Sequence, residues 1–235
     1  MENTALHLIP NFLADNTSHV MPPYIKEIIQ QINIFFVEEI KSARRFLKKI
    51  DKEINIDNLT FHLLNEHKNN DLQHAKEYFA KGKSIAYISE AGCAAVADPG
   101  AELVSLAHSM NIKVIPYVGP NSILLALMAS GFNGQKFIFH GYLPNKQPAL
   151  SHKIKEIELH SQKENCTQIF IETPYRNNQL LEELLKHCHS HTKLCVASNL
   201  TSMEEKIISC SIYDWRKMTY NFHKIPAVFL LYNHF

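Results

Sequence analysis

Short apolar runs alternate along the chain with longer segments in which apolar residues recur at helical spacing. Runs of the first kind predict strands, and segments of the second kind predict helices. In the first half, strands are predicted over residues 5–9, 34–37, 59–64, 84–89 and 112–118. Helices are predicted between them, over residues 23–31, 40–50, 71–81 and 101–109. This alternation predicts a parallel sheet with helices on its faces.

The second half also contains apolar strands and helices, but the helices are fewer than in the first half. Helices are predicted over residues 119–131 and 178–188, and strands over 136–140, 168–172, 193–197, 206–211 and 227–232. The second helix has an apolar stripe formed by Leu180, Leu181, Leu184, Leu185 and Cys188. The polar segment 145–165 has a modest inner face, supplied by Ile154, Ile157 and Leu159. We therefore expect an α/β protein with two α/β domains, residues 1–117 and 118–235, and a ligand cleft between them.

Composition narrows the class of protein without naming a function. The chain has 235 residues, of which 46% are hydrophobic and 20% charged, as in ordinary folded proteins. Its 24 Lys and Arg against 23 Asp and Glu give a net charge of +1, so any RNA or membrane binding needs a local patch. The apolar runs are shorter than the roughly 20 residues of a membrane span, and no signal-peptide pattern is present. Five cysteines without paired spacing favour a cytoplasmic protein without disulfides or a metal site.

The seven glycines are few, and several follow predicted strands. Gly92 and Gly100 lie within ISEAGCAAVADPG, and Gly119 lies within VGPNS. The carboxyl ends of strands are where open α/β sheets hold ligands. A strand-to-helix turn needs the same residue types, so both interpretations stay open. Asp98 is expected to cap a helix whose first residue is Pro99.

Several common catalytic motifs are absent from the sequence. Neither phosphate-binding pattern, GxxxxGK[ST] or GxGxxG, occurs, and neither does GxSxG or HExxH. His187, His189 and His191 surround the end of a predicted helix, but residues two apart do not share a helical face. This histidine cluster fits a solvated helix end better than a metal site.

Four segments occur in an order that resembles a known family. They are ISEAGCAAVADPG, VGPNSILLALMASG, FHGYLP and FIETPYR. Together they resemble the tetrapyrrole-methylase superfamily of S-adenosylmethionine-dependent methyltransferases, and within it the cytidine 2′-O-methyltransferases of small-subunit ribosomal RNA. The resemblance covers about residues 34 to 199. The chain departs from the family pattern in four places: no glycine follows the first strand, Cys93-Ala94 replaces Thr-Pro, Tyr175 replaces His, and ASNLTSMEEK at residues 197–206 replaces ARELTKxHEE.

This resemblance implies a set of cofactor-binding residues. In the first domain they are Pro10, Ser89, Gly92, Cys93, Ala94 and Val96. In the second domain they are Ser122, Ile171, Leu200, Pro226 and Ala227. The resemblance also implies S-adenosylmethionine as cofactor, ribosomal RNA as substrate and a homodimer.

Methyl transfer to a hydroxyl needs a group that accepts its proton. The carboxylates near predicted strand ends are Glu38, Glu39, Glu90, Asp98 and Glu172, and His67 is a further titratable side chain there. Asp98 is expected to act as a cap, and Glu172 to anchor Arg176 or a backbone amide. This leaves Glu39 and Glu90 as candidates for the general base.

A basic helix is the candidate for contact with RNA. The segment VEEIKSARRFL resembles a basic segment of the family, and Lys41, Arg44 and Arg45 form adjacent rows with Lys48 and Lys49. The alternative interpretation is that these basic residues only form a solvent-exposed helix face. Arg176 is a second candidate, either for an anion or for a salt bridge between the two domains.

Three functions remain open from the sequence alone. An RNA ribose 2′-O-methyltransferase is favoured by the order of the four segments and by the basic helix. A methyltransferase for a small molecule of the tetrapyrrole type is consistent with the near-neutral net charge. A cofactor-binding protein without turnover is suggested by the altered loops.

Overall fold

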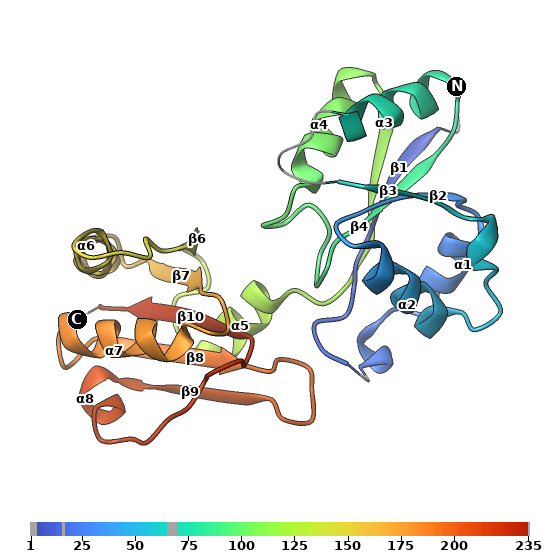
Figure 1. The fold of residues 1–235 in the computed structure, drawn as a ribbon. Helices are drawn as coiled ribbons and strands as arrows, with labels where there is room; N and C mark the ends of the chain where they lie inside the picture. The colour runs from blue at the N-terminus through green and yellow to red at the C-terminus, as the bar shows by residue number, and fades with distance from the viewer. Residues whose placement is uncertain (1–3, 16, 65–69, 235) are drawn as a thin grey trace. The chain divides into compact units, whose positions relative to one another are not determined.

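The computed structural model describes residues 4–15, 17–64 and 70–234. The chain divides into two compact units, unit 1 (Met1–Asn121) and unit 2 (Ser122–Phe235). Each unit contains a five-stranded sheet with helices packed on it (Figure 1). The predicted α/β class is therefore confirmed.

Unit 1 has a fully parallel sheet in the order β3-β2-β4-β1-β5. Its strands are β1 (Ala5–Ile9), β2 (Ile34–Val37), β3 (Thr60–Leu63), β4 (Ile85–Ile88) and β5 (Lys113–Pro116). Its helices are α1 (Ile25–Gln30), α2 (Ile40–Ile50), α3 (Asn70–Ala80) and α4 (Gly100–Ser109), with short 3₁₀ turns η1 (Ser18–Val20) and η2 (Ile56–Asn58). The predicted parallel sheet is confirmed.

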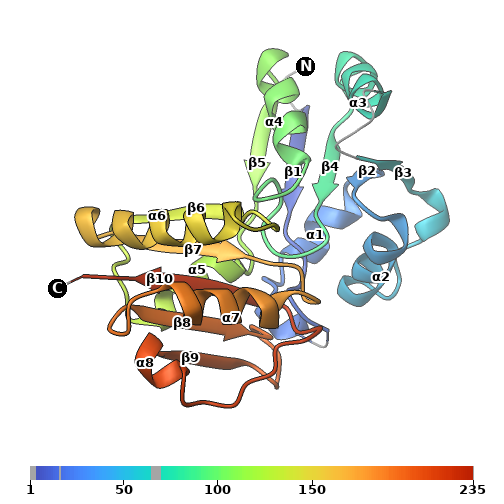
Figure 2. The same cartoon turned by 60° about the vertical axis from the view of Figure 1, so that its left-hand side comes forward.

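Helices cover both faces of the unit 1 sheet (Figure 2). Helices α1 and α2 pack on one face, where Ala86 and Ile88 of β4 join their core. Helices α3 and α4 pack on the other face, where Ile85 and Tyr87 lie. All four residues of β4 are buried. A strand buried on both sides must be apolar throughout, which is why β4 shows no alternation.

Unit 2 has a mixed sheet in the order β6-β7-β10-β8-β9. Its strands are β6 (Phe137–Tyr142), β7 (Thr167–Ile171), β8 (Lys193–Ser198), β9 (Lys206–Ser211) and β10 (Ala227–Tyr232). Its helices are α5 (Ser122–Ser130), α6 (Ala149–Glu164), α7 (Asn177–His187) and α8 (Ile212–Trp215). Only β6 and β7 pair in parallel, and the other neighbours are antiparallel. The connection between β8 and β9 is too short for a crossover, so these two strands can pair only antiparallel.

The helices of unit 2 pack on its sheet through apolar faces. Helices α6 and α7 share one core cluster with β7, β8 and β10, and α5 packs on β8, β9 and β10. The predicted stripe of α7 is confirmed, since all five of its members are buried. In α6, Ile154 and Ile157 are buried as expected, but Leu159 is 49% exposed. At about 100° per residue, position 159 lies off the face shared by Ile154, Ile157 and Ser161, so the prediction for Leu159 is wrong.

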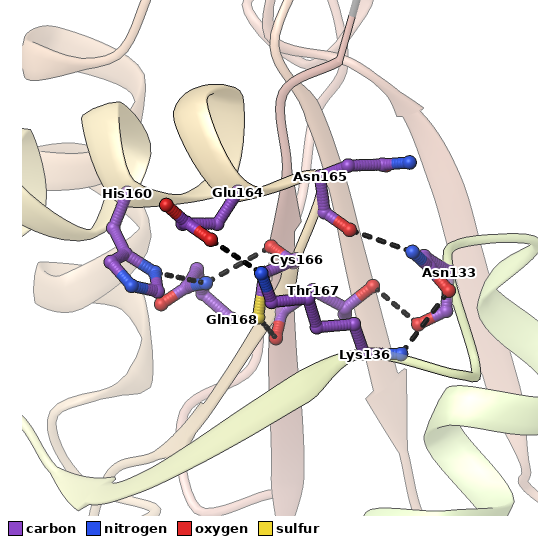
Figure 3. Close-up of polar contacts among 8 residues, drawn as sticks. All are labelled: Asn133, Lys136, His160, Glu164, Asn165, Cys166, Thr167 and Gln168. Atoms are coloured by element: carbon purple, nitrogen blue, oxygen red, sulfur yellow. Dashed lines mark hydrogen bonds and ion pairs between the residues drawn. The ribbon is translucent and has the colours of Figure 1, made fainter.

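A polar cluster joins α6 to β7 (Figure 3). Helix α6 ends at Glu164, and its C-cap residue Asn165 has a left-handed φ of 49°. The Asn133 side-chain amide donates to the Asn165 carbonyl over 2.6 Å, and the Thr167 hydroxyl donates to the Asn133 carbonyl over 2.9 Å. The Lys136 ammonium lies 2.5 Å from the Glu164 carboxylate. Most donors and acceptors of this junction find partners within it, and the Tyr232 hydroxyl of β10 adds a hydrogen bond to the Asn165 side chain.

Candidate functional site

Three loops meet at the carboxyl edge of the unit 1 sheet. They follow β1, β4 and β5, which are neighbours in that sheet and run in the same direction. The loop after β1 begins at Pro10, the loop after β4 at Ser89, and the loop after β5 at Tyr117. This edge is where open parallel sheets hold their ligands. Six residues of the predicted cofactor set lie in these loops.

Asn11 joins the first two of these loops. Its backbone N–H donates to the Gly92 carbonyl over 2.8 Å, and the Gly92 N–H donates back over 3.1 Å. Its side-chain amide donates to the carbonyls of Ser89 and Glu90 over 2.9 and 3.1 Å. Asn11 is only 6% exposed. Asn11 was not among the predicted site residues, although an amide side chain two residues after an apolar strand is a signal that the sequence contains.

Glycine is required where the loops pack most closely. A Cβ on Gly119 would lie 2.2 Å from the Cβ of Pro10. A Cβ on Gly92 would lie 3.2 Å from a Leu13 methyl carbon and 3.3 Å from the Pro120 carbonyl oxygen. Gly92 also has a φ of +73°, which other residues rarely adopt. The Cys93 thiol lies 3.6 Å from the same Pro120 carbonyl oxygen. The loops after β1, β4 and β5 therefore contact one another mainly through backbone.

The loop after β4 holds two alanines in the left-handed region. Ala95 has a φ of 64° and Ala97 a φ of 61°. Conformations of this kind cost about 1–3 kcal/mol each and persist where the surroundings impose them. The Asp98 carboxylate imposes the left-handed conformation on Ala95, because it accepts the N–H groups of Ala95 (2.9 Å) and Gly100 (2.8 Å). Val96, between the two alanines, is 42% exposed.

Asp98 acts at the start of α4 in a slightly different way from the prediction. Helix α4 begins at Gly100 and has Pro99 at its N-cap position, one residue later than expected. The Asp98 side chain still accepts the N–H of Gly100, so it satisfies an amide at the start of the helix.

The predicted bases Glu39 and Glu90 both lie near the N-terminus of α2. Glu39 is the N-cap of α2, and its two carboxylate oxygens accept the N–H groups of Lys41 (2.8 Å) and Ser42 (2.6 Å). The exposed Glu90 accepts a hydrogen bond from the Ser42 hydroxyl. Both carboxylates therefore contact the first turn of the basic helix.

Glu38, at the end of β2, contacts the loop that follows β4. Its carboxylate accepts the N–H of Glu90 over 2.9 Å and the Tyr87 hydroxyl over 3.4 Å. Burial raises the pKa of Glu38. Burial likewise raises the pKa of Asp98. The pKa of the Tyr87 hydroxyl is also raised, first by burial and then by the Asp98 and Glu38 carboxylates, so this group remains a hydrogen-bond donor.

The basic residues predicted to contact RNA are exposed on α2. Lys41, Arg44 and Arg45 all face solvent. Arg44 lies 3.5 Å from the Asp57 carboxylate. A hollow of about 480 Å³ runs along this helix and is lined by all three cations.

In unit 2, four residues of the predicted cofactor set lie near one end of the sheet. Ile171 ends β7 and Ala227 begins β10, next to it in the antiparallel pair. The Pro226 carbonyl accepts the N–H of Asn199, just before Leu200. Ser122, the fifth member of the set in this unit, begins α5. In the same loop as Leu200, the buried Thr201 hydroxyl has no hydrogen-bond partner among the described residues.

Arg176 forms an ion pair within unit 2, with Glu172, as expected for the Glu172 side chain rather than as a salt bridge between domains. Its guanidinium lies 3.1 Å from the Glu172 carboxylate, which also accepts the Thr173 N–H over 2.7 Å. A second guanidinium contact reaches the Asn145 carbonyl over 3.3 Å. The buried Nε of Arg176 has no partner within the described part of the chain.

His67 lies outside the described residues. Over residues 4–15, 17–64 and 70–234, no group of three or more His, Cys, Asp or Glu is placed to hold a metal ion. In the same residues, no helix has the length and apolar character needed to cross a membrane.

Comparison with known proteins gives the family. The model of the family described as Tetrapyrrole (Corrin/Porphyrin) Methylases matches residues 21–215. The chain is 30% identical over 181 residues to "Ribosomal RNA small subunit methyltransferase I" of Vibrio cholerae, a match covering 77% of this chain but only 60% of that relative. The protein of that name from Escherichia coli O157:H7 is 27% identical over 238 residues, covering 97% of this chain and 78% of the relative.

Solved structures share the fold. The methyltransferase CobJ superposes with a TM-score of 0.65 at 17% identity, covering 98% of this chain and 95% of CobJ. Uroporphyrin-III C-methyl transferase from Thermus thermophilus, solved with S-adenyl homocysteine, gives a TM-score of 0.57 at 11% identity and covers 97% of each chain. The predicted resemblance is confirmed by the family model and by the named relatives, and the solved structures confirm the fold. With the family model matching most of its length, this chain belongs to the tetrapyrrole (corrin/porphyrin) methylase family.

Proposed function

We propose that the protein is an S-adenosylmethionine-dependent methyltransferase that methylates a ribose 2′-hydroxyl of small-subunit ribosomal RNA in the cytoplasm. Its family and the names of its relatives support the reaction and the substrate. The five free cysteines are consistent with a reducing compartment. The observation that carries the proposal is the close-packed, backbone-lined loop edge of unit 1, with its left-handed alanines and Gly92.

The residues of this edge fit a cofactor that is recognised mainly through backbone groups. The Cys93-Ala94 pair, which replaces the Thr-Pro of the family pattern, leaves these backbone groups in place, because backbone recognition does not depend on the side chain. When bound, S-adenosylmethionine supplies a methyl group on a positively charged sulfur. We assign its binding to Pro10, Ser89, Gly92, Cys93, Ala94 and Val96 of unit 1. The unit 2 residues Ser122, Ile171, Leu200, Pro226 and Ala227 belong to the proposed set through the family resemblance.

Glu90 is the proposed acceptor of the proton from the ribose hydroxyl. It is exposed and accepts one hydrogen bond from the Ser42 side chain, whereas both oxygens of Glu39 are engaged by backbone amides. As the N-cap of α2, Glu39 instead orients the N-terminus of this basic helix. A Glu90→Gln variant should bind cofactor normally and lose about 10²- to 10⁴-fold in single-turnover rate.

Calorimetry with S-adenosylmethionine and S-adenosylhomocysteine tests the cofactor site. The wild type should bind with micromolar affinity, and Gly92→Val should abolish binding because its side chain would enter the close packing around Leu13 and Pro120. Gly134→Val is the matched control, since a Cβ at Gly134 meets nothing within 4 Å. If neither ligand binds to the wild type, the proposal of a methyltransferase fails for the free protein.

Substrate assays separate the alternatives. Methyl transfer to small-subunit RNA, with RNA affinity that falls as salt rises, supports the proposed substrate. Transfer to a tetrapyrrole without RNA binding would favour the small-molecule alternative. Cofactor binding without transfer to either would indicate a binding protein without turnover.

We also propose a homodimer. Helix α5 exposes two apolar side chains one turn apart, Leu124 (47% exposed) and Met128 (79%). The strand β6 adds Phe137 and Ile138, which are 39% and 37% exposed. Light scattering should give about twice the chain mass, and a Met128→Glu variant should shift the protein towards the monomer.

A further inference from the structure

A second hollow lies on α2 beside the one lined by the predicted RNA contacts. It has a volume of about 410 Å³ and is bounded by α2 and by the segment after β1. Arg45 and Lys48 line both hollows, so the two meet along these side chains. Volumes of this order are typical of sites for small ligands, about 300–1,000 Å³. The two hollows thus form a continuous surface around the helix.

The lining of the second hollow is strongly basic. Arg45, Lys48, Lys49 and Lys52 contribute to it, and no carboxylate does. Lys49 is paired with Asp15 over 2.5 Å. Within the described residues, neither Arg45 nor Lys52 has an ion pair at 4 Å or less. Since the whole chain has a net charge of only +1, this is a local concentration of positive charge.

The second hollow also offers apolar and hydroxyl groups. The Phe12 ring forms part of its wall, and the Lys49 ammonium lies 6.0 Å from the centre of that ring. The exposed Ser18 adds a hydroxyl, whereas the hydroxyl of the buried Thr17 donates to the Ala14 carbonyl over 2.7 Å. Cations for phosphate, hydroxyls for hydrogen bonds and an apolar wall for the sugar are the groups that a nucleic-acid backbone requires.

We propose that this second hollow binds backbone phosphates of an RNA strand that crosses α2 from the first hollow. The inference rests on the proposed function and adds to it a binding subsite formed by Lys48, Lys49, Lys52 and Ser18. Arg45 and Lys48, which line both hollows, contact the RNA where it crosses α2. The second hollow binds the next phosphates along the same RNA strand.

The subsite is directly connected to the proposed cofactor loops. Phe12 follows Asn11, whose side chain accepts the Phe12 N–H over 2.8 Å. Asn11 in turn pairs with Gly92 in the loop after β4. A strand held in the second hollow therefore lies against the same segment of chain that shapes the loop edge of unit 1.

Fluorescence anisotropy with a labelled 12-nucleotide single-stranded RNA tests the subsite on the full chain. The variant Lys48→Ala/Lys52→Ala is compared with Lys155→Ala/Lys163→Ala, which removes two lysines of α6. Each lost phosphate contact should weaken binding about fivefold at 0.1 M salt and reduce the slope of log K against log salt by about 0.7. The control variant should bind as the wild type does. Equal melting temperatures, and a Lys48→Gln/Lys52→Gln variant with the same loss, exclude a folding defect.

The outcomes separate this inference from the proposed function. If Lys41→Ala/Arg44→Ala weakens RNA binding but Lys48→Ala/Lys52→Ala does not, the subsite is wrong and the RNA methyltransferase stands. If cytidine monophosphate or inorganic phosphate competes as well as the 12-mer does, the hollow is a small-anion site and the inference is overturned. If the wild type binds no RNA while it binds cofactor, both the subsite and the RNA substrate are rejected.

Discussion

The loop after β4 in unit 1 and the junction between α6 and β7 in unit 2 are both polar connections beside buried strands. The unit 2 junction pairs its charges locally, with Lys136 on Glu164, and its left-handed residue is an asparagine, which tolerates that conformation. The unit 1 loop places alanines in the left-handed region and lies next to carboxyls whose pKa values are raised by burial. One region pairs its charges locally, whereas the other retains backbone strain and half-buried carboxyls with raised pKa values, as is common at binding sites.

The strongest test of this contrast adds one methyl group to each region. A Cβ on Gly100 would lie 2.2 Å from a ring carbon of Tyr87, which is fully buried. Gly100→Ala should therefore destabilise unit 1 by about 1–3 kcal/mol, even though alanine is the better helix former. Gly134→Ala, beside Asn133, should be nearly neutral because nothing lies within 4 Å. Urea unfolding of both variants measures the difference, and an equally stable Gly100→Ala would contradict the close packing of this edge.

A smaller effect distinguishes the regions by their pH dependence. The pKa of Glu38 is raised by burial, so the folded state holds its proton more tightly than the unfolded state does. Stability from this group is present at low pH and is lost as pH rises from the unfolded value near 4.5 through the raised folded value. Glu164 behaves oppositely, because its hydrogen bond to Lys136 lowers its pKa. Its contribution is present above the unfolded value near 4.5 and is lost as the pH falls through its lowered folded value.

Two substitutions measure these opposite signs. Glu38→Gln should raise stability at neutral pH relative to acid pH, while Glu164→Gln should lower it. Unfolding free energies between pH 4 and pH 8, compared with the wild type, give both slopes. A Glu38→Gln profile parallel to that of the wild type would show that this carboxyl is not buried in the folded protein.

The smallest expected effect concerns the ion pair of the junction. Lys136 and Glu164 are about half-exposed, and surface pairs of this kind add little stability. Lys136→Ala should lower the melting temperature by about 2 °C or less at low salt, and the difference should vanish in 1 M salt. A larger loss that survives high salt would show that the junction depends on this charge more than its exposure suggests.

Most of the fold could be predicted from residue patterns because the strands are short and apolar. Helix α2 has its predicted bounds, since Glu39 before it and the row of lysines and arginines along it are strong local signals. The sequence pattern does not encode the order of the strands. In unit 2, the short β8–β9 connection does indicate an antiparallel pair, but nothing in the sequence pattern indicates that β10 lies between β7 and β8.

The candidate site was predictable only in part. Glycines after strands marked the loop edge, because their conformational freedom is visible in the sequence. Asn11 was missed because its bonds to Ser89 and Gly92 are made by residues about 80 positions away. The left-handed Ala95 and Ala97 were unpredictable for another reason: alanine carries no signal for that conformation, and here the Asp98 carboxylate imposes it on Ala95.

The strand order has a consequence for how the chain is made. β10 lies between β7 and β8, although it follows every other strand of its sheet in sequence. During synthesis, β7 and β8 therefore emerge from the ribosome without their shared neighbour and keep open edges until β10 appears. β1 has the same difficulty in unit 1, because its partners β4 and β5 are the last strands of that sheet to be made. Both sheets must wait for late strands, so nascent chains of this protein expose unpaired edges that chaperones recognise or that aggregate.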